Sequence, residues 1–158
     1  MSNEKQFVVI ERVYRASLSE VWDLWTTKEG FESWWGPQGF RVEVHEIDAR
    51  VGGLLRYDMI ADTPEMIAAM KQIGRPAASP TRCRFGEVER HKRLVLTSHI
   101  DFFPGVTPYE NSIAVDFSFS GGSVRMLVTL EKMHSEDFTN MQRDGFTSQL
   151  TKLDKRFP

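Results

Sequence analysis

Few ionisable side chains of this chain are spaced so that they could act together in chemistry. His99 and Asp101 are two residues apart, so on a strand they share one face and could form a hydrogen-bonded pair or two metal ligands. His45 and Glu46 are adjacent, so on a strand they point to opposite faces and cannot form a compact metal site. The pattern favours a solvated strand face over a metal centre. We therefore expect no metal and no other cofactor.

Nucleophiles are equally scarce. Cys83 is the only cysteine, which excludes an intramolecular disulfide, and it shares a strand face with Phe85. This pattern predicts a buried, inert thiol. The chain contains no Gly-x-Ser-x-Gly elbow and no glycine-rich phosphate loop. If the protein were an enzyme, Glu87, His99 or Asp101 would be the candidates for an acid or base, and we expect no catalytic residues.

The elements that would position a site are clearest in the last third of the chain. Apolar residues alternate from 113 to 119 and again from 124 to 130, and Gly121-Gly122 lies between them, which predicts two strands joined by a tight turn. From Ser135 the period changes to that of an amphipathic helix. The expected inner helix face comprises Phe138, Met141, Gln142, Gly145, Phe146, Gln149, Leu150 and Leu153.

The first two thirds read as strands with two helical interruptions. Strands are expected over 7–14, 40–47, 54–60, 82–89 and 94–102. Ser17 and Glu20 have the spacing of a capping box before a helix, and a second short helix over 28–33 is expected to end before Gly36-Pro37. Residues 63–81 interrupt the sheet with a helix that begins at Pro64. The order predicts an α+β fold with a long antiparallel sheet.

Length and charge restrict the class of protein further. A chain of 158 residues fits one domain, 1–158, with 63–81 as a helical insertion or lid. The net charge of −2 gives no reason to expect nucleic acid or an anionic membrane as a partner. Residues 1–6 are polar and no segment has the length and apolarity of a membrane span. With a single cysteine, these features predict a cytoplasmic protein.

Four segments in the correct order resemble the START-like (SRPBCC) superfamily. They are residues 7–17 followed by Glu20-Val21-Trp22, then Trp34-Trp35-Gly36-Pro37, then residues 51–59, and residues 86–89 with 93–97. The branch that they resemble is the C-terminal domain of the activator of heat-shock-protein-90 ATPase. The sequence departs from the pattern at Leu55, which replaces an aromatic residue, and at Phe146, where the family often has Trp. The resemblance implies a helix-grip fold, in which a curved sheet wraps around the C-terminal helix and encloses a cavity.

The expected ligand-binding residues follow from this arrangement and from the apolar face of each strand. The expected walls are Leu55, Tyr57, Met59, Phe85, Phe117, Met126 and Phe146, and Trp34, Trp35, Met66 and Met70 are expected near the mouth. The Tyr57 hydroxyl could orient a ligand. Met66 and Met70 are one helical turn apart, so their segment is expected to be a lid or a dimer contact. Gly145 indicates either a close approach of helix to sheet or room for a cavity.

The expected function is binding of a small hydrophobic molecule, driven by burial of its apolar surface. Two alternatives remain. Members of the wider superfamily include cyclases and dehydratases, so a polyketide-cyclase-like or dehydratase-like enzyme is the first. A chaperone ATPase-activator-like interaction module is the second. A homodimer is also compatible with the sequence.

Overall fold

The computed structural model describes residues 7–101 and 103–158, so residues 1–6 and the expected strand end at 102 lie outside the described chain. The strands are β1 (Phe7–Tyr14), β2 (Phe40–Ile47), β3 (Leu54–Ala61), β4 (Ala78–Glu89), β5 (Arg93–Ile100), β6 (Tyr109–Ser120) and β7 (Ser123–Glu131). The helices are α1 (Leu18–Thr26), α2 (Lys28–Glu32), α3 (Pro64–Gln72) and α4 (Glu136–Arg156).

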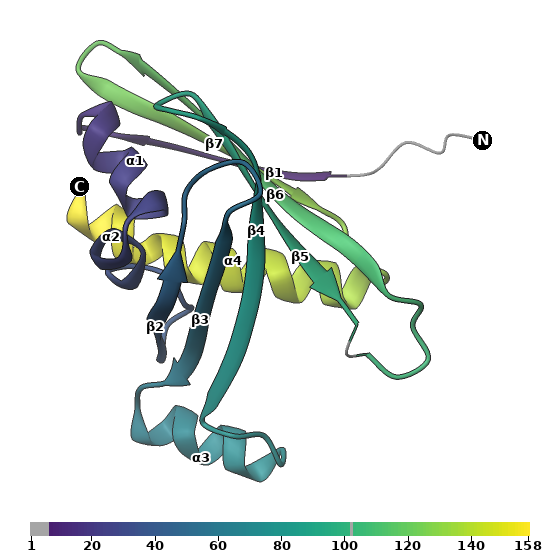
Figure 1. Cartoon of the computed structure of the whole chain (residues 1–158). Helices are drawn as coiled ribbons and strands as arrows, with labels where there is room; N and C mark the ends of the chain where they lie inside the picture. The colour runs from purple at the N-terminus through teal and green to yellow at the C-terminus, as the bar shows by residue number, and fades with distance from the viewer. Residues whose placement is uncertain (1–6, 102) are drawn as a thin grey trace.

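The strands form one seven-stranded antiparallel sheet in the order β1-β7-β6-β5-β4-β3-β2. The sheet is strongly bent, and α4 crosses it, with α1 and α2 near the C-terminal end of α4 (Figure 1). Helix α3 lies apart from α4, at the end of β3 (Figure 1). This is the α+β helix-grip architecture that the sequence predicts.

The capping box and the glycine turn that the sequence predicts are both formed in the structure. The Ser17 side chain accepts from the Glu20 backbone N–H at 3.1 Å, and the Glu20 carboxylate accepts from the Ser17 backbone N–H at 3.0 Å, so the capping box is complete. Gly121 and Gly122 have φ of 60° and 79°, values that suit glycine in a tight hairpin turn. These short-range features fix where α1 and β7 begin.

Strand β4 begins at Ala78, four residues before the position expected from sequence, so the segment between β3 and β4 is shorter than 63–81. Pro80 suggests irregular structure because it lacks an N–H, but here it pairs with Asp58 of β3. The register of β4 with β5 starts only at Cys83, so Pro80 lies where β4 is a local edge. Proline is tolerated in such a position because no partner strand needs its N–H.

The two faces of the sheet differ as the strand patterns predict. Arg56, Arg82 and Arg84 are exposed on the convex side, while the alternate residues of β3 and β4 are buried. On α4 one expected inner residue is wrong: Met141 is 65% exposed. At about 100° per residue, Met141 lies about 140° around the helix from the buried Phe146, which is too far to face the sheet.

Candidate functional site

A cluster of buried aromatic rings fills the space between the sheet and the end of α4 near α1 and α2. Trp34 and Trp35 pack edge to face at 5.1 Å between ring centroids, and each also packs against Phe146 of α4, at 6.2 Å and 5.8 Å. Trp25 of α1 contacts both tryptophans at 5.0 Å and 5.5 Å. This end of the interior is solidly packed, so a guest molecule would have to lie farther along α4.

The two neighbouring tryptophans have different roles in this cluster. The Trp34 indole N–H donates to the Leu24 carbonyl at 2.8 Å, which fixes that ring within the helical layer. The Trp35 indole N–H donates to the Tyr57 hydroxyl at 3.1 Å, so Trp35 reaches the sheet. Of the pair, Trp35 is therefore the one that borders the expected wall residue Tyr57.

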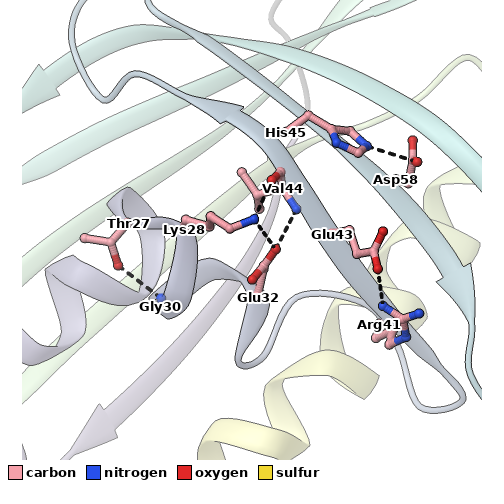
Figure 2. A network of polar contacts seen from close by, with 9 residues as sticks. All are labelled: Thr27, Lys28, Gly30, Glu32, Arg41, Glu43, Val44, His45 and Asp58. Atoms are coloured by element: carbon pink, nitrogen blue, oxygen red, sulfur yellow. Dashed lines mark hydrogen bonds and ion pairs between the residues drawn. The ribbon is translucent and has the colours of Figure 1, made fainter.

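Polar contacts to β2 hold α2, and with it both tryptophans, in place. The Glu32 carboxylate accepts from the Val44 backbone N–H at 2.7 Å, and the Lys28 ammonium donates to the Val44 carbonyl at 2.8 Å (Figure 2). The Thr27 hydroxyl accepts from the Gly30 backbone N–H at 3.0 Å (Figure 2). The two bonds to Val44 satisfy its backbone groups on the outer edge of β2 and stop another strand from pairing there.

The loop after Trp35 is bound to α4 through backbone groups. Gln149 accepts from the Gly36 backbone N–H at 2.9 Å, and the Lys152 ammonium donates to the carbonyls of Gly36 at 2.8 Å and Phe40 at 3.1 Å. Burial lowers the pKa of Lys152. The φ of 102° at Gly36 is a conformation that side chains disfavour, which explains the glycine.

Gly145 lies on the same flank of α4, one turn toward the N-terminus, and it faces open space. Apart from its chain neighbours and the nearby backbone of its own helix, a Cβ built on Gly145 would have no atom within 4 Å. On one side of it Gln149 and Lys152 contact the 36–40 loop; on the other, Phe138 packs on Phe103 at 4.5 Å between ring centroids. Of the two sequence interpretations of Gly145, a close approach to the sheet is wrong, and a cavity beside the helix remains a prediction.

A polar strip crosses the concave face of the sheet and meets α4 at Gln142. Cys83 of β4 and Ser98 of β5 are cross-strand partners whose side chains are 3.3 Å apart, and Ser98 is in turn opposite Asn111 of β6. The next pair along is Tyr57 with Thr81. Burial raises the pKa of both the Tyr57 hydroxyl and the Cys83 thiol, so these groups are neutral at physiological pH.

The expected wall and mouth residues lie on this concave face or on the elements that pack against it. Those that are buried are Leu55, Tyr57, Phe85, Phe117, Met126, Phe146, Trp34 and Trp35. Phe117 and Met126 belong to the packed end, because Phe117 contacts the Trp22 ring at 5.5 Å and Met126 accepts a hydrogen bond from the Trp25 indole at 3.4 Å. Their role as ligand contacts remains a prediction.

Of the four methionines expected at the wall and mouth, Met126 is fully buried, and Met59, Met66 and Met70 are only partly buried. The Met59 sulfur lies 3.3 Å from a Cβ built on Gly36, and the Met66 methyl lies 3.0 Å from one built on Gly39. Both side chains therefore pack on the loop that follows the tryptophans. Met70 is half-buried on α3, beside the exposed Ile67 and Ile73. The lid or dimer role of α3 remains a prediction.

The ionisable residues that could serve an enzyme lie away from this face. The side chains of His99 and Asp101 are 62% and 58% exposed and 3.9 Å apart. Glu87 pairs with Arg93 at 3.1 Å on the convex side. His45 pairs with Asp58 at 3.0 Å between β2 and β3 (Figure 2). Within the described residues no group of three or more His, Cys, Asp or Glu side chains could hold a metal ion.

Two surface pockets occur elsewhere on the chain. One, of about 840 Å³, lies where β1 begins and α4 starts, and it is lined by Phe7, Val8, Lys132, Met133, His134, Ser135, Glu136, Thr139, Asn140 and Arg143. The other, of about 190 Å³, is lined by His45, Arg56, Tyr57, Asp58, Pro80, Thr81 and Arg82. The pocket residues that belong to the concave face are Val8, which is opposite the buried Leu130 and packs against the core, in the first pocket, and Tyr57 and Thr81 in the second.

Sequence reasoning missed several polar side chains on the concave face and on α4. It selected apolar walls and left out Lys152, Thr81 and Ser98, although it placed Gln142 and Gln149 on the inner helix face. Two glutamines on an otherwise apolar helix face are a usable signal, because buried amides need specific partners. The partners themselves, such as the Gly36 backbone, come from distant segments and leave no local pattern.

Comparison with known proteins identifies the family. The family described as activator of Hsp90 ATPase homolog 1-like protein matches residues 15–157. The chain belongs to this family. No curated protein matches the chain.

Solved structures show the same fold at low sequence identity. A protein from Chromobacterium violaceum is 18% identical with a TM-score of 0.73, covering 96% of each chain. The AHSA1 protein from Silicibacter pomeroyi is 15% identical with a TM-score of 0.73, again over 96% of each chain. DynU16, a protein in the dynemicin biosynthetic locus, is 14% identical with a TM-score of 0.64, covering 94% of this chain and 46% of its own. Among the described residues, none of the helices is long and apolar enough to cross a membrane.

Proposed function

We propose that the protein binds a small, mostly apolar molecule between α4 and the concave face of the sheet. The observation that carries this proposal is the open space beside Gly145, between two points where α4 is held, through which a ligand would enter. The ligand would contact the part of the concave face that the aromatic cluster does not cover, near Tyr57, Met59 and Ser98. Burial of its apolar surface, worth about 25 cal/mol per Å², would drive binding.

Binding is favoured over catalysis by the chemistry of the polar strip. The Tyr57 hydroxyl and the Cys83 thiol both have a raised pKa, so neither is suited to accept a proton at neutral pH. Glu87, His99 and Asp101, the candidates for an acid or base, are all exposed. A cyclase-like or dehydratase-like reaction would need an acid or base that this part of the concave face lacks among its described residues.

The experiment is a ligand series read by tryptophan emission and by thermal shift. The four tryptophans are all buried, and Trp35 borders the proposed site, so a bound ligand is expected to change the emission. At a ligand concentration of about 100 times Kd, binding stabilises the folded state by about 2.7 kcal/mol. Alcohols, esters and aromatic compounds form the series.

A matched pair of variants locates the site. Gly145→Leu places a branched side chain in this open space and is expected to weaken binding, while Thr147→Leu puts the same side chain on an exposed position of α4 and should leave binding unchanged. If no compound of the series changes emission or Tm, the protein does not bind small apolar molecules. If Gly145→Leu binds as well as the unmodified chain, the site lies elsewhere.

A further inference from the structure

A chain of side-chain amides links α4 to the polar strip. The Gln142 amide nitrogen donates to the Asn111 side-chain oxygen at 3.0 Å, and the Asn111 amide nitrogen donates to the Glu131 backbone carbonyl at 3.1 Å. Asn111 is buried, with 4% of its surface exposed. The two amides are therefore a continuous polar path from β7 through β6 to the helix.

The orientation of both amides is determined by the backbone at one end of this path. The Glu131 carbonyl can only accept, so Asn111 must turn its nitrogen toward it and its oxygen toward the helix. Gln142 must then turn its nitrogen to Asn111. The Gln142 side-chain oxygen (Oε1) is left buried, with no hydrogen-bond partner among the described residues. A buried acceptor without a donor is unfavourable, so a bound molecule that donates a hydrogen bond there would be stabilised.

This acceptor is beside the proposed binding site. Gln142 precedes Gly145 by three residues, so the two lie one turn apart on the same flank of α4. Its partner Asn111 is opposite Ser98, and Ser98 contacts Cys83 at 3.3 Å. A molecule that enters beside Gly145 and moves the side chains covering Gln142 aside would bring its polar end to the unpaired oxygen.

We infer that the ligand of this site carries a neutral hydrogen-bond donor, a hydroxyl or an amide N–H, at its polar end and donates it to the Gln142 Oε1. The inference rests on the proposed binding function. A carboxylate would set its negative oxygens against this acceptor, and the strip of Tyr57, Cys83, Ser98 and Asn111 provides no cation to balance a buried charge. The site thus selects alcohols or amides over fatty acids.

Three probes with ten carbons each test this selection in the unmodified protein: decanol, its isomer nonyl methyl ether, and decanoate. Decanol donates a hydrogen bond, the ether only accepts, and decanoate is charged. One net hydrogen bond predicts that decanol binds about twofold to tenfold more tightly than the ether, with decanoate weakest. The measurement is titration of tryptophan emission at constant pH and salt, below the concentration at which each probe forms micelles.

A variant pair assigns the preference to the amide. Gln142→Met keeps the length of the side chain but removes the acceptor, and it is expected to reduce the decanol-to-ether ratio to about one. Met141→Gln alters an exposed neighbour and should keep the ratio of the unmodified chain. Equal binding of alcohol and ether, or tightest binding of decanoate, overturns the donor requirement while the binding function stands. If no probe binds, both the binding function and the donor requirement fail. The ratio in the unmodified protein decides the matter even if Gln142→Met does not fold.

Discussion

Replacing Gly145 with alanine is expected to stabilise the protein, although Gly145 lies in the middle of the helix that the sheet holds. Glycine in a helix interior is less favourable than alanine by about 0.8–1.0 kcal/mol, because it loses more backbone entropy on folding. The added Cβ would meet no other atom within 4 Å, so no clash offsets this gain. For a chain of 158 residues, a change of about 1 kcal/mol raises Tm by about 3 °C.

The assay is thermal unfolding followed by circular dichroism, with urea unfolding to obtain the free energy difference. Gly30→Ala is the matched control, because a Cβ on Gly30 would clash with the backbone oxygen of Asp23 and lie 2.7 Å from the Thr27 hydroxyl. That variant should lose about 1–3 kcal/mol through overpacking. If Gly145→Ala lowers Tm, α4 is in close contact with its surroundings at this point. The open space would then not exist, and the reasoning behind the binding site would fail.

Three further predictions concern packing and pH. Tyr14→Phe removes a 2.7 Å hydrogen bond to the Asp154 carboxylate and should lower the free energy of unfolding by about 1.5–3 kcal/mol in urea titrations, whereas no loss would mean that this bond does not hold α4 to β1. Ser17→Ala removes the cap of α1 and should cost about 1 kcal/mol; restored stability on adding Glu20→Ala would argue against a capping box. Because burial raises the pKa of Cys83 above its ordinary value of 9.0, its stabilising contribution is complete below pH 9 and is lost as pH rises through the folded-state pKa. Stability should therefore fall above pH 9, and Cys83→Ala should reduce that slope; an unchanged slope would contradict a buried thiol.

Much of the fold could be predicted because its signals are local. The capping box at Ser17, the proline at the start of α3, the glycine pair before β7 and the period change at Ser135 each act over a few residues. The alternation in the strands predicts which face is buried, because a strand turns each successive side chain to the opposite side. Where prediction failed, as at Pro80 in β4, the outcome depended on whether a neighbouring strand needed that residue's N–H.

The sequence alone determined the order of the elements, the apolar face of each strand and the family pattern of Trp34-Trp35-Gly36-Pro37, because these depend on residue type and short spacing. Only the tertiary structure decided which part of the interior is filled by rings and that Gly145 faces open space. It also decided that Gln142 has an oxygen without a partner, since its bonds run through Asn111 to the backbone of β7. Such pairings join residues far apart in the chain, and no local pattern encodes the distance between them.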